Sequence, residues 1–215
     1  ASLQQRAWVV DTARISGLQL GIKRSADGDI SLIGLQGKSV DQKFDDTQID
    51  WAEQIRSWRG IELLSAQIQF DDQMQPQFSG LYEVNELALL QGKQSTLIGD
   101  IQLPHHMGQQ LSFTVDAMLT SSGISNWRVE QLDARQLQLA TIFQNQQMQD
   151  VSVTRGRADV SVVIGSNLNK QWQGKIQLTD VGLENLTNPD RGSVSINSLS
   201  GEFDWQGDWT AWQLA

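Results

Sequence analysis

The sequence contains no cysteine among its 215 residues. Disulfides, thiolate metal sites and cysteine nucleophiles are therefore excluded together. Histidine is limited to the adjacent pair His105 and His106. In an extended segment these two side chains would point to opposite sides and would not easily share one ion. The sequence therefore predicts neither a metal site nor a cofactor.

Long apolar runs are missing as well. The longest uninterrupted runs, at 7–10 and 87–90, have four residues, whereas a membrane-spanning helix needs about 20. The chain is therefore not expected to cross a bilayer as a helix. Basic residues are also in deficit, with 16 Lys and Arg against 25 Asp and Glu and a net charge of -9. Such a surface repels phosphate backbones, so nucleic acid is not an expected partner.

The usual catalytic signatures are absent too. There is no glycine-rich phosphate loop, no dinucleotide fingerprint and no nucleophile elbow. Adjacent carboxylates occur at Asp45 and Asp46 and at Asp71 and Asp72. Each pair falls at the edge of a predicted element, where acidic residues more often cap helices or solvate turns than catalyse or bind calcium. We therefore predict that this protein is not an enzyme.

What the sequence does contain is apolar alternation. In the segment 111–119, apolar residues occupy every second position and mostly polar residues lie between them, which is typical of a strand with one apolar face. The same alternation recurs at 64–70, 97–103, 158–164, 172–178 and 203–205. Runs spaced by about 10 to 15 residues favour a mainly β protein built on an antiparallel sheet, and we treat 1–215 as a single segment.

Two stretches depart from the strand period. Trp51, Ile55 and Trp58 follow a helical spacing within 46–58. Asp45, Asp46 or Thr47 could serve as the N-cap, and Gly60 follows just past the end. This predicts a short amphipathic helix near 46–58. A weaker helical pattern covers 137–148.

Alternation alone leaves two architectures open. The apolar faces could pack on each other in a β-sandwich, or one sheet could keep its apolar face open. The eight tryptophans fit either packing or a sugar-binding platform. A β-sandwich adhesion or carbohydrate-binding module is therefore the alternative to the interpretation that follows.

Several segments resemble a known family. They are the predicted Trp51 helix and the residues that follow it through Phe70, Ile101 to Pro104 with Gly108 and Gln109, Leu111 to Met118, Asn126 and Trp127, and Trp172 to Leu183. Together they are similar to the N-terminal periplasmic region of YhdP-like proteins. These belong to the AsmA-like superfamily of bacterial bridge-like lipid transfer proteins, which also includes TamB. The shared features are apolar alternation with scattered Trp and Gly, across about residues 1–186.

The resemblance implies a long antiparallel sheet curved into a U-shaped apolar groove with one or two short helices. It implies a lipid-conducting segment of a periplasmic protein that moves phospholipid between the inner and outer membranes. An inner-membrane anchor, expected to be absent from this chain, would hold the full-length protein. Its partners would be phospholipid acyl chains, and exposed sheet edges would favour self-association. The residues expected to contact lipid are Leu64, Ile68, Phe70, Leu97, Ile101, Leu103, Leu111, Phe113, Val115, Ala117, Leu119, Val160, Val162, Ile164, Ile176 and Leu178.

Overall fold

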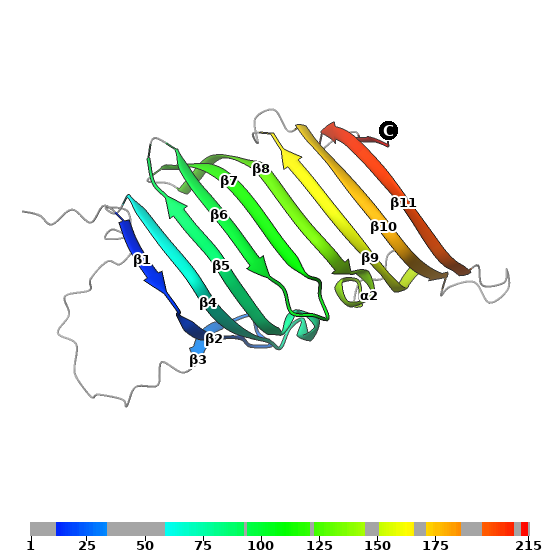
Figure 1. Ribbon diagram of the computed structural model, residues 1–215, viewed down its shortest axis with the longest axis horizontal. Coiled ribbons are helices and arrows are strands. Elements are labelled where there is room, and N and C mark those ends of the chain that lie inside the picture. The colour runs from blue at the N-terminus through cyan, green and yellow to red at the C-terminus, as the bar shows by residue number, and fades with distance from the viewer. Residues whose placement is uncertain are drawn as a thin grey trace, which may run out of the picture.

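The chain folds as one open sheet in a single layer (Figure 1). The computed structural model describes residues 12–33, 59–92, 94–120, 123–144, 151–165, 171–185, 195–208 and 212–214. The strands are β1 (Thr12–Ser16), β2 (Gln19–Arg24), β3 (Ile30–Ile33), β4 (Gly60–Asp72), β5 (Gly80–Leu90), β6 (Ser95–Gln102), β7 (Gln110–Thr120), β8 (Gly123–Gln138), β9 (Val151–Ile164), β10 (Gln171–Asn185), β11 (Ser195–Asp208) and β12 (Trp212–Leu214). The predicted mainly β, open antiparallel sheet is confirmed.

Strand order follows chain order along most of the sheet. From β4 to β12 each strand pairs antiparallel with the next one in sequence. The exception lies at the N-terminal edge, where β1 and β2 pair in succession with the two halves of β4, both parallel to it. Gly17 joins β1 and β2 with a φ of 69°, a left-handed conformation that glycine adopts without steric cost.

Helix contributes little. A 3-10 turn, η1 (Pro76–Phe78), connects β4 to β5, and a four-residue helix, α2 (Leu139–Ile142), follows β8. The helix predicted over 137–148 is therefore wrong in extent, because 137–138 still belong to β8. The predicted helix at 46–58 lies outside the described residues. Within the described ranges, no helix has the length and apolar character needed to cross a membrane.

The sheet has an apolar face and a polar face, and irregularities in the strands decide which residues join each. Ser65 has a φ of 51°, and the β5–β6 register shifts between Val84 and Glu86. Leu64 pairs with Glu86, which itself pairs with Asp100 on the polar face. The expectation that Leu64 shares a face with Ile68 and Phe70 is therefore wrong, because a bulge reverses the alternation on either side of it.

The two ends of the strands differ. At the lower edge in Figure 1, η1, the 103–109 turn and α2 are linked to one another by hydrogen bonds. The Tyr82 hydroxyl donates to the Phe78 carbonyl at 2.7 Å, and its oxygen lies 3.1 Å from Met107 Sδ. The Gln138 N–H donates to the Met107 carbonyl at 2.7 Å. We call this edge the linked rim. The opposite edge, where β6 and β10 begin, we call the free rim.

Candidate functional site

Three continuous rows of apolar residues cross eight strands of the apolar face. Each row takes one residue from each of β4 to β11, and the backbone registers place those residues side by side. The lower row is Ala66, Val84, Ile101, Leu111, Ala134, Val160, Ile176 and Phe203; the middle row is Leu63, Leu87, Gly99, Phe113, Leu132, Val162, Gly174 and Trp205; the upper row is Ile61, Leu89, Leu97, Val115, Val129, Ile164, Trp172 and Gly207.

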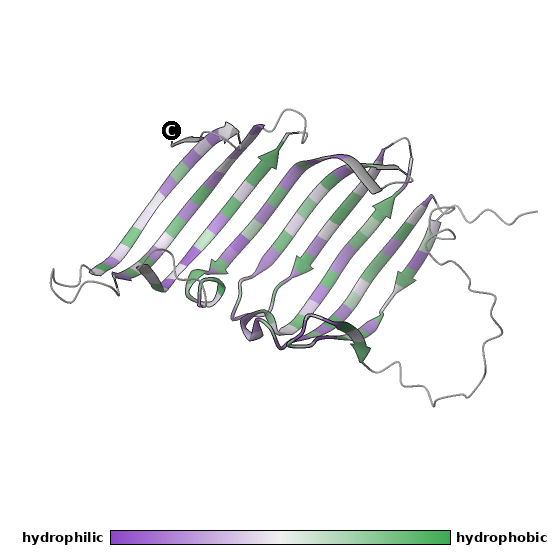
Figure 2. Cartoon of the chain, turned by 180° about the vertical axis from the view of Figure 1, so that it is seen from behind, coloured by the Kyte–Doolittle hydropathy of each residue, from purple (hydrophilic) through white to green (hydrophobic). Residues whose placement is uncertain are grey.

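The rows together form an extended apolar track. Seven strand spacings of about 4.8 Å give a length of about 34 Å, and four residue steps along a strand give a width of about 13 Å. Figure 2 shows the corresponding hydrophobic and hydrophilic bands alternating along the strands. The rows contain no ionisable residue. The track is therefore long and apolar enough to lie against hydrocarbon chains.

No second layer covers this track in the part of the chain that the structure describes. Most residues of the rows are half-buried, and Leu97 is 36% exposed. Full burial of apolar residues is confined to mostly small side chains such as Ala66, Val84 and Ala134, and to a cluster of Leu139, Ala158 and Val181 beside α2. These residues therefore do not form the core of a closed β-sandwich.

Aromatic rings lie across two glycines of the middle row. An added Cβ at Gly99 would sit 2.3 Å from Phe113 Cζ, and one at Gly174 would sit 2.3 Å from Trp205 Cζ2. Both rings thus occupy the space that a side chain on the neighbouring strand would take. The rings therefore lie against the backbone of the neighbouring strands and do not project from the middle row.

Substituting Gly174→Ala should displace the Trp205 ring from the sheet. We expect a destabilisation of about 1 to 3 kcal/mol, because overpacking forces side chains and backbone to move. A change in the near-UV circular dichroism of tryptophan would report the displacement. Gly201→Ala is the matched control, because its added Cβ would lie 3.4 Å from Phe203, an ordinary contact. Equal responses from the two variants would contradict the ring-over-glycine packing.

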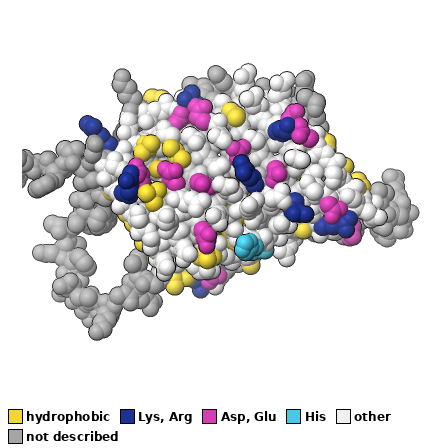
Figure 3. Space-filling view, viewed as in Figure 1, with side chains coloured by type: hydrophobic (Ala, Val, Ile, Leu, Met, Phe, Trp, Pro, Cys, Tyr) yellow, Lys and Arg dark blue, Asp and Glu magenta, His cyan; other side chains and the backbone are white. Residues whose placement is uncertain are grey.

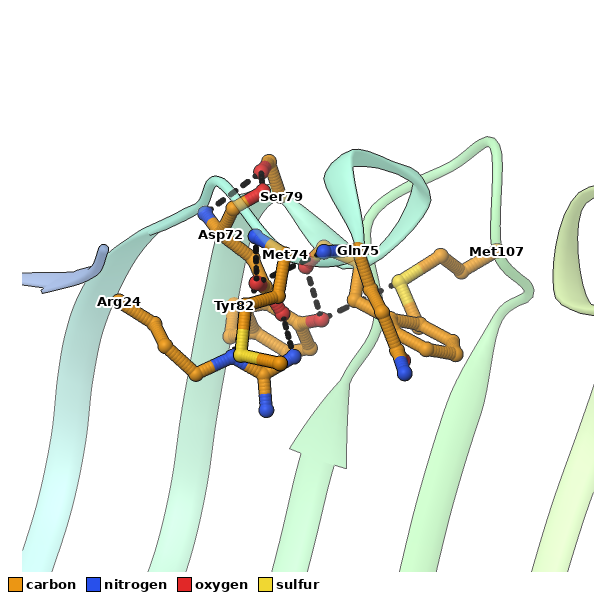
Figure 4. A network of polar contacts seen from close by, with 8 residues as sticks. Arg24, Asp72, Met74, Gln75, Ser79, Tyr82 and Met107 are labelled. Atoms are coloured by element: carbon orange, nitrogen blue, oxygen red, sulfur yellow. Dashed lines mark hydrogen bonds and ion pairs between the residues drawn. The ribbon is translucent and has the colours of Figure 1, made fainter. Parts of the chain in front are cut away.

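One buried ion pair interrupts the apolar face at its N-terminal, lower corner (Figure 4). Asp72 is 1% exposed, and Arg24 Nε donates to its Oδ1 at 2.8 Å while Nη2 donates to Oδ2. The backbone N–H groups of Met74 and Gln75 also donate to Oδ1, each at 3.0 Å. Asp72 thereby holds the turn that leads into η1, and it anchors the linked rim.

The charge state of Asp72 follows from these contacts. Burial alone would raise the pKa of Asp72, but the Arg24 hydrogen bond, the Gln75 and Met74 amides and the Arg24 charge outweigh it and leave the pKa lowered. Burial, with the nearby Asp72 charge, raises the pKa of the Tyr82 hydroxyl. Both groups therefore serve as fixed structural contacts at neutral pH, with Asp72 ionised and Tyr82 protonated.

Most residues predicted to contact lipid lie on the apolar face. Ile68, Phe70, Ala117 and Leu178 flank the rows on that face, as their pairing with Tyr82, Gly80, Trp127 and Ala158 places them. Leu64 is on the polar face. Leu103 lies beyond the end of β6 in the 103–109 turn, and the side chain of Leu119 lies outside the description. The other nine are members of the rows: Leu97, Ile101, Leu111, Phe113, Val115, Val160, Val162, Ile164 and Ile176.

Other members of the rows were missed from the sequence. Leu87 and Leu89 belong to an unbroken apolar run, so their alternation is hidden by Ala88 and Leu90. Val129 and Leu132 are three positions apart because the β7–β8 register shifts between Thr114 and Val115. A two-residue period cannot reveal either pair.

Of the acidic pairs and the histidines, Asp72 and His106 have structural contacts. Asp71 and Asp72 are successive residues of β4 and so point to opposite faces, and Asp72 is buried in an ion pair instead of solvating a turn. His106 Nε2 lies 3.1 Å from the Gln77 carbonyl oxygen within the linked rim. Asp45 and Asp46 lie outside the described residues. Among the described residues, no group of three or more His, Asp or Glu side chains could hold a metal ion.

The polar face carries charges of both signs, spread across the sheet (Figure 3). Asp116 accepts hydrogen bonds from Thr96 at 2.7 Å and from Arg128 Nη2 at 2.9 Å. Arg14 and Glu62 form another surface pair at 2.7 Å. The hydrophobic side chains on this face gather over the N-terminal strands in Figure 3. The contrast between the faces makes the apolar one the candidate functional site.

No protein-family model, curated protein or solved structure matches this chain.

Proposed function

We propose that the apolar face binds lipid acyl chains and conducts them along the sheet, as a transfer segment without catalysis. The observation that carries this proposal is the set of three apolar rows, continuous over eight strands and covered by no second layer in the described part of the chain. Each CH₂ group removed from water gains about 0.8 kcal/mol, and an acyl chain needs no specific hydrogen bond to be held there.

The geometry supports movement along the rows in particular. The rows run across strands in register. An acyl chain that moves along a row by the width of one strand therefore meets the same kind of apolar surface again. No ionisable side chain interrupts the rows from β4 to β11. A ligand that shifts in this way gains and loses similar contacts at each step, so the track holds acyl chains without trapping them at one position.

The resemblance to YhdP-like proteins extends the proposal to the cell. In that setting the protein is anchored in the inner membrane and works in the periplasm, where it carries phospholipid toward the outer membrane and supports its homeostasis. Sheet edges would allow self-association of the segment. Among the described residues the lower part of β11 is one such edge, because β12 pairs with Trp205, Gln206 and Gly207 alone.

The proposal is tested by organic extraction of the purified protein followed by mass spectrometry. Co-purifying phospholipid is expected, at a stoichiometry that native mass spectrometry can count. The proposal would be overturned by protein that carries no lipid and takes up none from vesicles. Binding of such lipid-free protein to sugars on a glycan array would instead support the carbohydrate-binding alternative.

A further inference from the structure

Two tryptophans at the C-terminal end of the apolar face have unpaired N–H groups. Trp172 is in the upper row and Trp205 in the middle row, on the adjacent strands β10 and β11. Their ring centroids are 6.0 Å apart, with the ring planes at 57°. The Nε1 atom of each ring is buried and has no hydrogen-bond partner among the residues that the structure describes. Buried donors without acceptors are uncommon in native proteins and destabilise the structure that contains them.

The surroundings explain why these donors stay unpaired. The register neighbours are Ile164 and Gly207 for Trp172, and Gly174 and Leu214 for Trp205. None of these four residue types has a polar side chain. Trp205 also lies against Gly174, where an added Cβ would be 2.3 Å from the ring. Both indoles therefore hold buried hydrogen-bond donors within an apolar face, where their register neighbours supply no side-chain acceptor.

Their position along the strands suits the polar end of a lipid. Trp172 is the second residue of β10, next to the free rim. From Trp172 to Leu178 the apolar side of β10 extends for six residue steps, about 20 Å at about 3.3 Å each, which exceeds the hydrocarbon depth of one leaflet, about 15 Å. Acyl chains that start at the tryptophans can therefore run toward the linked rim while the headgroup leaves over the free rim.

We propose that Trp172 and Trp205 bind the ester carbonyl groups of an acyl lipid, with each indole turning so that its buried N–H donates to a carbonyl oxygen. The inference rests on the proposed function, and it adds a fixed position for one part of the ligand. A carbonyl fits better than a phosphate, because both donors are neutral and the ion pair of the apolar face, Arg24 with Asp72, lies at the opposite corner. Indole rings also favour the boundary between hydrocarbon and polar groups.

The test compares two phospholipids with the same headgroup and chain lengths, one with ester linkages and one with ether linkages, which lack the carbonyl oxygen. The full chain should bind the diester lipid about tenfold more tightly, as two neutral hydrogen bonds allow. The double variant Trp172→Phe with Trp205→Phe keeps the rings and removes both donors, so it should bind the two lipids equally. Trp127→Phe is the matched control and should keep the preference, since Trp127 Nε1 is not among the buried unpaired atoms.

A second measurement needs no variant. The indole N–H resonances of Trp172 and Trp205 should shift when the diester lipid binds and should shift less with the diether lipid. Equal affinities of the wild-type protein for the two lipids, with equal resonance shifts, would overturn this inference and leave the proposed function standing. Failure of both lipids to bind would overturn the inference and the proposed function together.

Discussion

Phe113→Asp should abolish lipid loading while leaving the sheet folded. Phe113 lies in the middle row, between Gly99 and Leu132, so the new carboxylate would stand on the track itself. An isolated charge in hydrocarbon costs several kcal/mol, which corresponds to a loss of at least about tenfold in bound lipid. Extraction and mass spectrometry measure the lipid, and circular dichroism checks the fold.

Thr114→Asp is the matched control on the same strand. Thr114 pairs with Ile98 and Gln131 on the polar face, where a carboxylate stays hydrated and the neighbouring Asp116 already has Arg128 as its partner. This variant should load lipid as the wild type does. The assignment of the track fails if folded Phe113→Asp protein binds lipid normally. It fails equally if that substitution unfolds the chain, because a closed core would respond in that way.

Asp72→Ala should cause the largest loss of stability that a single substitution produces at the N-terminal end of the sheet. It would leave the Arg24 charge without its partner and the Met74 and Gln75 amides without their acceptor. Removing one member of a buried ion pair costs about 3 to 5 kcal/mol. Hydrogen exchange of the β4 and β5 amides measures the loss locally. Glu62→Ala is the control: its partner Arg14 is 64% exposed, and such surface pairs contribute about 0 to 1 kcal/mol.

Lowering the pH should reproduce part of the loss of stability expected for Asp72→Ala. The pKa of Asp72 is lowered in the folded protein, so its contribution is fully present above the unfolded value of about 3.9 and is lost as the pH falls through the lower folded value. Protection of the β4 and β5 amides should therefore fall below about pH 4 in the wild type. Asp72→Asn should flatten that dependence. An unchanged acid profile in Asp72→Asn would show that other carboxylates control this end of the sheet.

The sequence was sufficient to predict six of the strands, β4, β6, β7, β9, β10 and β11, and most of the apolar face. In β7, the alternation from Leu111 to Ala117 is uninterrupted, and every expected apolar position with a described side chain lies on one face. Local periodicity works there because each strand pairs with its chain neighbours. It failed at Leu64. The backbone of the adjacent Ser65 is left-handed and reverses the alternation, but nothing in the sequence marks this serine as unusual.

The linked rim could not have been predicted from local patterns. Arg24 and Asp72 are brought together by the parallel pairing of β2 with β4, a contact between segments 48 residues apart. The sequence draws attention to Asp71 and Asp72, but nothing local distinguishes the buried carboxylate of Asp72 from the half-buried one of Asp71. The ring-over-glycine contacts likewise depend on the registers between strands, which the bulges shift.

From β4 to β12 each strand pairs with the next one in sequence, and this pairing also determines how the protein unfolds. In such a sheet each hairpin is stabilised by the two beside it, as repeats are in a solenoid, so stability is approximately a sum of intrinsic and nearest-neighbour terms. A substitution that destabilises β10 then destabilises β9 and β11 first. It affects β4 only through the strands that lie between them. Unfolding of this chain is accordingly a spreading process with partly unravelled states, and cooperativity has a finite reach along the sheet.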